Sequence, residues 1–163
     1  MKFLHGMIRV KDIEKSLRFY QDFLGLKLAK VSELEDCKLY FLEDDFGHRA
    51  IELTANFETP EKYELGECFG HFAFGVKSLD EIGAKLKEFG YEWLWEPFVL
   101  NRVNEPNKKT KIAFICDPDG VEIELIEKEN AWFISTLSTE KCYSVYAYIY
   151  SFNGFICFCT LLF

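Results

Sequence analysis

The sequence repeats itself once, and this repeat constrains the fold more than any other feature. His5 precedes a Val-Lys pair by five residues, and His71 precedes the same pair by the same interval, 66 positions later. The run Ile-Glu-Leu around Glu52 returns around Glu124. Recurrence of paired features along a chain indicates two similar structural units. Each half therefore supplies one histidine and one glutamate.

Alternating polarity and helix-capping signals predict the same order of elements in both halves. The first half should have strands at 1–10, 26–31, 38–42 and 50–56, with a helix after Asp12 whose apolar stripe is Ile13, Leu17, Tyr20 and Leu24. The second should have strands at 71–76, 91–98, 110–116 and 121–127, with a helix from a Ser78–Glu81 capping box to Gly90. The fold class is therefore α+β. Two tandem βαβββ modules, at 1–57 and 69–128, make a single domain over 1–130.

The repeated residues have the chemistry of a metal site. His5, Glu52, His71 and Glu124 would converge if the first and fourth strands of each half are neighbours. A nitrogen and oxygen set without thiolate suits a six-coordinate divalent ion such as nickel, cobalt or manganese, with zinc as the alternative. Any one of these residues alone would more often be an ordinary surface or satisfied group. Four of them at matched repeat positions weaken that interpretation.

Strand alternation adds two candidate binding residues. Arg9 lies four residues after His5, and Asn56 four after Glu52, so each points to the same side as its presumed ligand. An arginine there could clamp a carboxylate, and an asparagine could hydrogen-bond an amide. The alternative for Arg9 is a salt-bridged strand end. His48 has no counterpart in the repeat and is expected at the surface.

Composition excludes some functions. The 163 residues are 49% hydrophobic, enough for one domain with a core, and the net charge of −8 argues against a nucleic-acid partner. Six cysteines occur without a C-x-x-C pattern, which is typical of free thiols in a reducing compartment. Residues 1–10 lack the long apolar run of a secretory signal, so the expected location is cytoplasmic.

Four stretches resemble the glyoxalase I family, of the vicinal oxygen chelate superfamily: 4–20, 51–56, 62–71 and 117–127. The first and last, which includes the turn Asp-Pro-Asp-Gly, resemble the superfamily broadly, and the other two are more specific to glyoxalase I. The compact span from Val31 to Glu52 resembles the short bacterial type. That type is generally active with nickel or cobalt, although zinc remains an alternative.

The resemblance implies a homodimer in which mixed sheets form a barrel-like site across the two chains. His5 and Glu52 of one chain would bind one divalent ion together with His71 and Glu124 of the other. Arg9 and Asn56 would hold glutathione, the cosubstrate, and His71 would also face the substrate.

The implied reaction is that of a lactoylglutathione lyase, which isomerises the hemithioacetal of methylglyoxal and glutathione to S-lactoylglutathione. Glu124 is the preferred catalytic base, and Glu52 is the symmetry-related candidate for the opposite face. One rival is methylmalonyl-CoA epimerase, where glutamine typically replaces the residue matching Glu52. A fosfomycin-type thiol transferase would use three ligands, and a metal-free small-molecule-binding module would use none.

The tail at 131–163 has a different character. From Cys142 to Phe163 it contains no charged residue. It could contact a membrane, pack on the dimer, or be extra sequence without a selected role. The last is preferred, because both modules are complete by residue 128. A chain that ends at Asn130 is therefore expected to remain soluble, dimeric and active.

Overall fold

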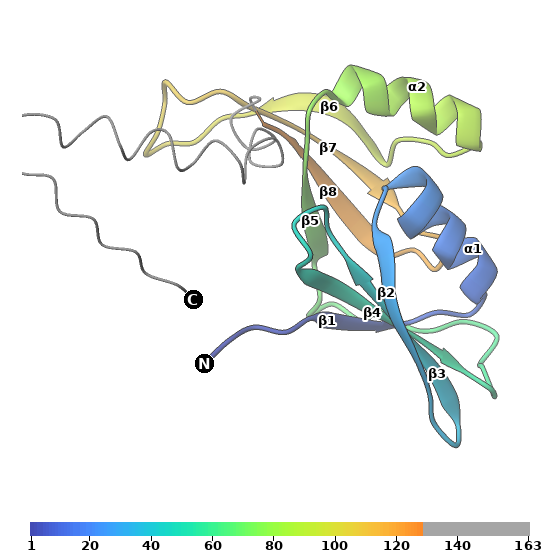
Figure 1. Cartoon of the computed structure of the whole chain (residues 1–163). Helices are drawn as coiled ribbons and strands as arrows, with labels where there is room; N and C mark the ends of the chain where they lie inside the picture. Colours follow the sequence, from blue (N-terminus) through green and yellow to red (C-terminus); the bar gives the residue numbers. More distant parts are fainter. Residues whose placement is uncertain (129–163) are drawn as a thin grey trace, which may run out of the picture. The chain divides into compact units, whose positions relative to one another are not determined.

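The computed structural model describes residues 1–128, and these comprise two successive βαβββ modules (Figure 1). The first contains β1 (Gly6–Arg9), α1 (Ile13–Leu17), a π-helical continuation η1 (Arg18–Phe23), β2 (Lys27–Glu33), β3 (Cys37–Glu43) and β4 (Arg49–Asn56). The second contains β5 (His71–Val76), α2 (Leu79–Phe89), β6 (Trp95–Leu100), β7 (Thr110–Cys116) and β8 (Glu122–Glu127). Both predicted module orders are confirmed. The predicted tail at 131–163 lies outside the described residues.

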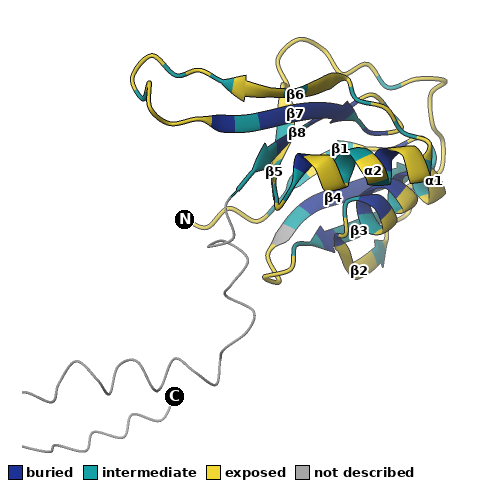
Figure 2. Cartoon of the chain, turned by 90° about the horizontal axis from the view of Figure 1, so that it is seen from above, coloured by how far each residue is buried: buried dark blue, intermediate teal, exposed yellow. Residues whose placement is uncertain are grey.

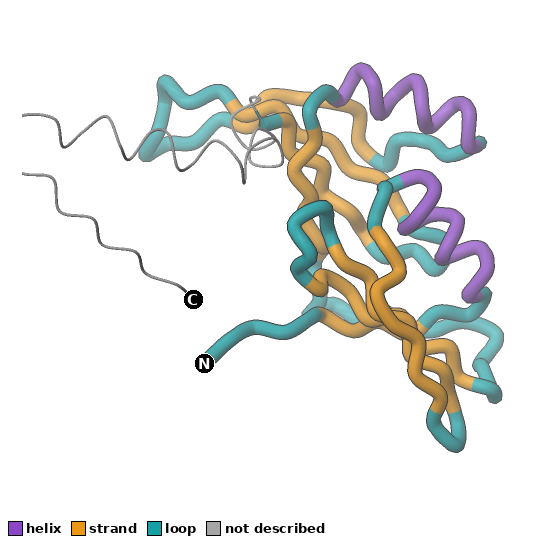
Figure 3. The backbone as a smooth tube through the Cα atoms, in the orientation of Figure 1, coloured by secondary structure: helices purple, strands orange, loops and turns teal. Residues whose placement is uncertain are grey.

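Each module forms its own four-stranded mixed sheet. The strand orders are β1-β4-β3-β2 and β5-β8-β7-β6, in which the first and fourth strands of a module pair in parallel and the others antiparallel. Figure 3 shows the helical segments of both modules on the same side of the strands. Neither sheet closes into a barrel within one chain. The predicted neighbour relation of first and fourth strands is therefore confirmed in both modules.

The helix boundaries follow the capping signals. The Asp12 side chain accepts a hydrogen bond from the Lys15 amide, and the Ser78 hydroxyl accepts one from the Glu81 amide. Gly90 ends α2 with a φ of 75°, a left-handed conformation that a side chain would disfavour.

Two predicted strand boundaries were wrong. The strand predicted at 1–10 begins only at Gly6, so that His5 directly precedes β1. The strand predicted at 91–98 begins only at Trp95, because the Tyr91 amide still donates to the Leu86 carbonyl at the end of α2.

The predicted apolar stripe of the first helix is confirmed, because Tyr20 is buried and the other three members pack against the core. It was incomplete, because Phe19 and Phe23 in the π-helical turn are buried as well.

The apolar core lies where the helical parts of the two modules meet (Figures 1 and 2). Edge-to-face ring contacts join Phe19 to Tyr91 and Phe23 to Phe89, with ring centroids 5.3 and 5.7 Å apart. Leu53 and Leu125 turn toward this core from the central strands. Since strand side chains alternate, Glu52 and Glu124 lie on the opposite faces of their sheets.

The modules also contact each other at the residues that follow the two repeated histidines, Gly6 and Phe72. A Cβ atom at Gly6, the residue after His5, would lie 2.8 Å from Cε1 of Phe72, the residue after His71. A side chain at Gly6 would therefore force the Phe72 ring to move.

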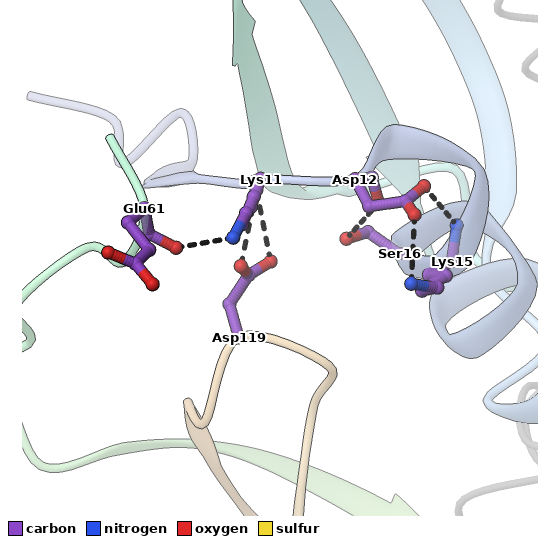
Figure 4. A network of polar contacts seen from close by, with 6 residues as sticks. All are labelled: Lys11, Asp12, Lys15, Ser16, Glu61 and Asp119. Carbon is purple, nitrogen blue, oxygen red and sulfur yellow. Dashed lines mark hydrogen bonds and ion pairs between the residues drawn. The ribbon is translucent and has the colours of Figure 1, made fainter. Parts of the chain in front are cut away.

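A polar network also joins the modules. The Tyr20 hydroxyl donates to Asp117 Oδ2 over 2.9 Å, and Asp117 Oδ1 accepts from the amides of Asp119 and Val121. The Lys11 amide donates to the Asp119 carboxylate, as Figure 4 shows. Burial raises the pKa of Asp117. The Asp-Pro-Asp-Gly segment is thus both a turn and the joint between the modules.

No helix within residues 1–128 is long and apolar enough to cross a membrane. His48 is exposed beside Asp44, as expected for a histidine outside the repeat. Three of the six cysteines fall within the described range, and all three are free thiols: Cys37, Cys68 and Cys116.

Candidate metal site

Module one brings its histidine and glutamate together. His5 Nε2 lies 3.0 Å from Glu52 Oε2, on the face of the sheet that the helices leave uncovered. The Thr54 hydroxyl donates to the other oxygen of Glu52, Oε1, over 3.1 Å. The His5 ring packs edge-on against Phe41, with centroids 5.6 Å apart. Glu52 is thus nearly buried and has a partner on each carboxylate oxygen.

Module two repeats this arrangement. His71 Nε2 lies 3.2 Å from Glu124 Oε2, and the His71 ring packs edge-on against Phe114, with centroids 5.5 Å apart. The His71 side chain is 40% exposed against 30% for His5, while both glutamates are mostly covered. The second pair is therefore built like the first but is more open on its histidine side.

Strand register explains why the two pairs match. Met7, two residues after His5, pairs with Glu52, and Ala73, two residues after His71, pairs with Glu124. The same offset in two parallel pairings gives the same distance between imidazole and carboxylate. The repeat seen in the sequence is thus also a repeat in geometry.

Sequence analysis missed the two phenylalanines beside the histidines. Phe41 pairs with Glu52 across β3 and β4, and Phe114 pairs with Glu124 across β7 and β8. Each ring covers one side of the imidazole and reduces its freedom to turn. The sequence does contain a phenylalanine on the strand before each glutamate. Only the strand register shows that this phenylalanine lies opposite the glutamate.

Each pair fits one side of a cation-binding site. Two ligand atoms at right angles, each about 2.1 Å from a divalent ion, would be about 3 Å apart, close to both observed separations. Each pair consists of one imidazole and one carboxylate, and neither includes a cysteine. The donors present are nitrogen and oxygen, as the sequence predicts.

One chain holds the two pairs apart. Among residues 1–128, no group of three or more histidine, cysteine or carboxylate side chains forms a potential metal site. The structure therefore unites His5 with Glu52 and His71 with Glu124, but it does not unite all four. A single chain presents two half-sites.

Arg9 and Asn56 lie on the same sheet as the first half-site. Arg9 is exposed on β1 and pairs with Thr54, while Asn56 ends β4 and pairs with Cys37. Alternation places both side chains on the face of Glu52. Within the described part of the chain Arg9 has no ion pair, so the alternative of a salt-bridged strand end has no support there.

A family model matches this architecture. Residues 2–125 match the model described as the Glyoxalase/Bleomycin resistance protein/Dioxygenase superfamily. A probable lactoylglutathione lyase of Synechocystis sp. is 38% identical over 134 residues, which cover 80% of this chain and 98% of that protein. The lactoylglutathione lyase of Escherichia coli O157:H7 is 38% identical over 137 residues, which cover 80% and 96%.

Solved structures give the same result. Glyoxalase I from Zea mays superposes with a TM-score of 0.65 at 32% identity, covering 77% of this chain but 44% of the maize chain, so this chain matches less than half of that protein. The trypanothione-dependent glyoxalase I of Leishmania major superposes with a TM-score of 0.61 at 28% identity, covering 83% and 92%.

Proposed function

Because the chain belongs to the glyoxalase I family of the glyoxalase superfamily, we propose that it is a lactoylglutathione lyase. It isomerises the hemithioacetal of methylglyoxal and glutathione to S-lactoylglutathione, and so removes methylglyoxal. The observation that carries this proposal is the pair of His–Glu half-sites in identical register, on a chain similar over 80% of its length to lactoylglutathione lyases.

The four repeat residues would hold one divalent ion: His5, Glu52, His71 and Glu124. Such an ion supplies positive charge that stabilises the oxygen anion formed when a carbon-bound proton leaves. Nickel or cobalt is the preferred ion, because the chain is of the compact bacterial type, and zinc is the alternative.

The protein's own groups move the proton. Glu124 takes the proton from the carbon that bears sulfur and hydroxyl, and returns it to the adjacent carbon, so that the thiohemiacetal becomes a thioester. Glu52 is the candidate for the opposite face. Arg9 offers a guanidinium to a glutathione carboxylate, and Asn56 offers an amide to its peptide groups. His71, the exposed first residue of β5, contacts the substrate.

Two half-sites in one chain favour a homodimer with shared sites. His5 and Glu52 of one chain would complete the ligand set with His71 and Glu124 of the other. Both pairs lie on sheet faces that the helices do not cover, which leaves these faces available to a second chain. The free thiols Cys37, Cys68 and Cys116 support a reducing compartment, and we place the enzyme in the cytoplasm.

Complementation tests the shared site. His5→Ala and Glu124→Gln proteins should each be nearly inactive, because every site in either homodimer carries one defect. After joint unfolding and refolding, a mixed dimer collects both defects in one site and none in the other. Random mixing should then give about a quarter of wild-type activity. No recovery, with mixed dimers demonstrated by mass spectrometry, would place each site within one chain.

A metal assay tests the reaction itself. Metal-stripped protein receives nickel, cobalt or zinc, and is assayed with methylglyoxal and glutathione and separately with methylmalonyl-CoA. We expect turnover only of the glutathione adduct, with more activity from nickel or cobalt than from zinc. Epimerase activity alone would refute the proposed reaction, and a preference for zinc would correct the metal.

A further inference from the structure

The two half-sites differ at one position that strand register makes equivalent. Thr54 follows Glu52 by two residues on β4, and Ile126 follows Glu124 by two residues on β8. Each pairs with the first strand of its module, Thr54 with Arg9 and Ile126 with Gly75. Both side chains therefore lie on the same face as the glutamate. Threonine can donate a hydrogen bond there, whereas isoleucine cannot.

This difference changes how the two carboxylates are held. Thr54 is 6% exposed, and its hydroxyl donates to Glu52 Oε1 over 3.1 Å, while His5 lies against Oε2. Glu124 has His71 against Oε2, but among the described residues Oε1 has no hydrogen-bond donor. Glu52 is thus fixed through both oxygens, and Glu124 through one.

A buried hydrogen bond to a carboxylate is strong and directional, so it fixes the rotation of the carboxylate. A carboxylate that must swing toward a substrate carbon and back needs one oxygen free of such a bond. We infer that Thr54 is a positioning residue that holds Glu52 as the stationary ligand. Of the two glutamates proposed above as proton carriers, this leaves proton transfer to Glu124 alone. The part of this inference that concerns proton transfer rests on the proposed function. The part that concerns the positioning of Glu52 as a metal ligand does not rest on the reaction.

Three variants of the full-length chain separate this role from simple packing. Thr54→Val keeps the shape and removes the donor, Thr54→Ser restores the donor, and Ile126→Thr introduces a donor beside Glu124. Ile126→Val controls for the change of volume at Ile126. Cobalt(II) is the probe, and its affinity is measured by competition with a chelator, without substrate. The absorption spectrum of bound cobalt reports ligand geometry.

Thr54→Val should weaken cobalt binding about tenfold to a hundredfold and alter the cobalt spectrum, as is usual when a partner of a metal ligand is lost. Thr54→Ser should restore both. Ile126→Thr should lower kcat with little change in KM, while Ile126→Val should leave kcat near wild type.

Wild-type cobalt affinity and spectrum in Thr54→Val would overturn the inference, as would a failure of Thr54→Ser to restore them. An unchanged kcat in Ile126→Thr would overturn the assignment of proton transfer. If wild-type protein binds cobalt but does not isomerise the hemithioacetal, the proposed reaction fails, while the cobalt measurements still decide the role of Thr54.

Discussion

The uncovered faces of modules one and two share a His–Glu pair with a phenylalanine beside it, and they differ in the residues next to that phenylalanine. On module one, Lys30 pairs with Phe41, and its Nζ lies 6.0 Å from the ring centroid, while Arg9 is exposed nearby on β1. On module two, Trp95 occupies the position equivalent to Lys30, with its ring centroid 5.2 Å from that of Phe114. The face of module one therefore carries two cationic side chains, whereas the face of module two carries a second aromatic ring beside its phenylalanine; they are called the cationic face and the aromatic face below.

This contrast indicates a division of work. A cationic face with a fixed glutamate suits the charged glutathione part and a stationary ligand. An aromatic face, where small residues follow His71 on β5, leaves room for the reacting carbons and for a mobile base. The repeat keeps the His–Glu geometry in both modules. The differences lie two residues further along the glutamate strand, at Thr54 and Ile126, and two strands away, at Lys30 and Trp95.

The largest expected effect separates the two glutamates. Glu124→Gln removes the proposed base as well as a proposed charged ligand, so we expect kcat to fall about 10³-fold or more at saturating metal. Glu52→Gln should act mainly through metal affinity, and excess metal should restore a larger share of its kcat. Steady-state kinetics across a metal titration measure both. Equal, metal-independent losses would mean that the modules do not divide the work in this way.

Arg9 tests the cationic face. Arg9→Ala should raise KM for the glutathione adduct about tenfold or more and leave kcat within about threefold, because a clamp distant from the reacting carbons contributes to binding. Lys38→Ala is a matched control, since Lys38 lies on the same sheet but pairs with Ala55 on its other face. A large loss of kcat in Arg9→Ala would place the arginine beside the metal instead.

The repeat made the fold and the ligand pairs predictable, because both depend on periodicity and on which strands are neighbours. The match between His5 and His71 in the repeat can be recognised even where the strand boundaries are predicted a few residues wrong. The four candidate ligands could therefore be named without coordinates, and the pairing within each module follows from the parallel β1–β4 and β5–β8 ladders.

Features that depend on exact register or on helix type were not predictable. The π-helical turn buries Phe19 and Phe23 in addition to Tyr20, and the predicted stripe did not include these two phenylalanines. Irregular pairing between Trp95 and Phe98 obscured which face of β6 carries the aromatic rings. The contact of Tyr20 with Asp117 joins residues that are distant in sequence, and no local pattern marks it.

A change in the polar contact between Tyr20 and Asp117, which joins the two modules, should lower the stability of the whole domain and not the activity of one face. Tyr20→Phe leaves one buried oxygen of Asp117 without its donor, so we expect a loss of about 1–3 kcal/mol in the free energy of unfolding. Urea unfolding measures this loss, and activity of the folded fraction is the control. A variant of wild-type stability would show that the joint rests on apolar contacts.

Asp117 also gives this joint a pH dependence. Its pKa is raised by burial above the ordinary 3.8, so the folded chain keeps this proton to higher pH than the unfolded chain does. The contribution of Asp117 to stability is thus greatest below pH 3.8 and falls as pH rises through the folded-state pKa, by about 1.4 kcal/mol for each unit of difference. Asp117→Asn should lose this component of the pH profile. An unchanged profile would assign it to other groups.

The smallest expected effect concerns the aromatic face. Trp95 is 57% exposed in the single chain, and its ring continues the row formed by Phe114 and His71, so it can line the space for the substituent of the 2-oxoaldehyde. Ring–ring contacts contribute about 0.5–1.5 kcal/mol, so Trp95→Leu should lower kcat/KM for the phenylglyoxal adduct about three- to tenfold relative to the methylglyoxal adduct. Lys30→Leu, at the equivalent position of module one, should leave this ratio unchanged. If both variants shift the ratio alike, the substituent contacts both faces, and the division between a binding module and a reacting module does not extend to substrate choice.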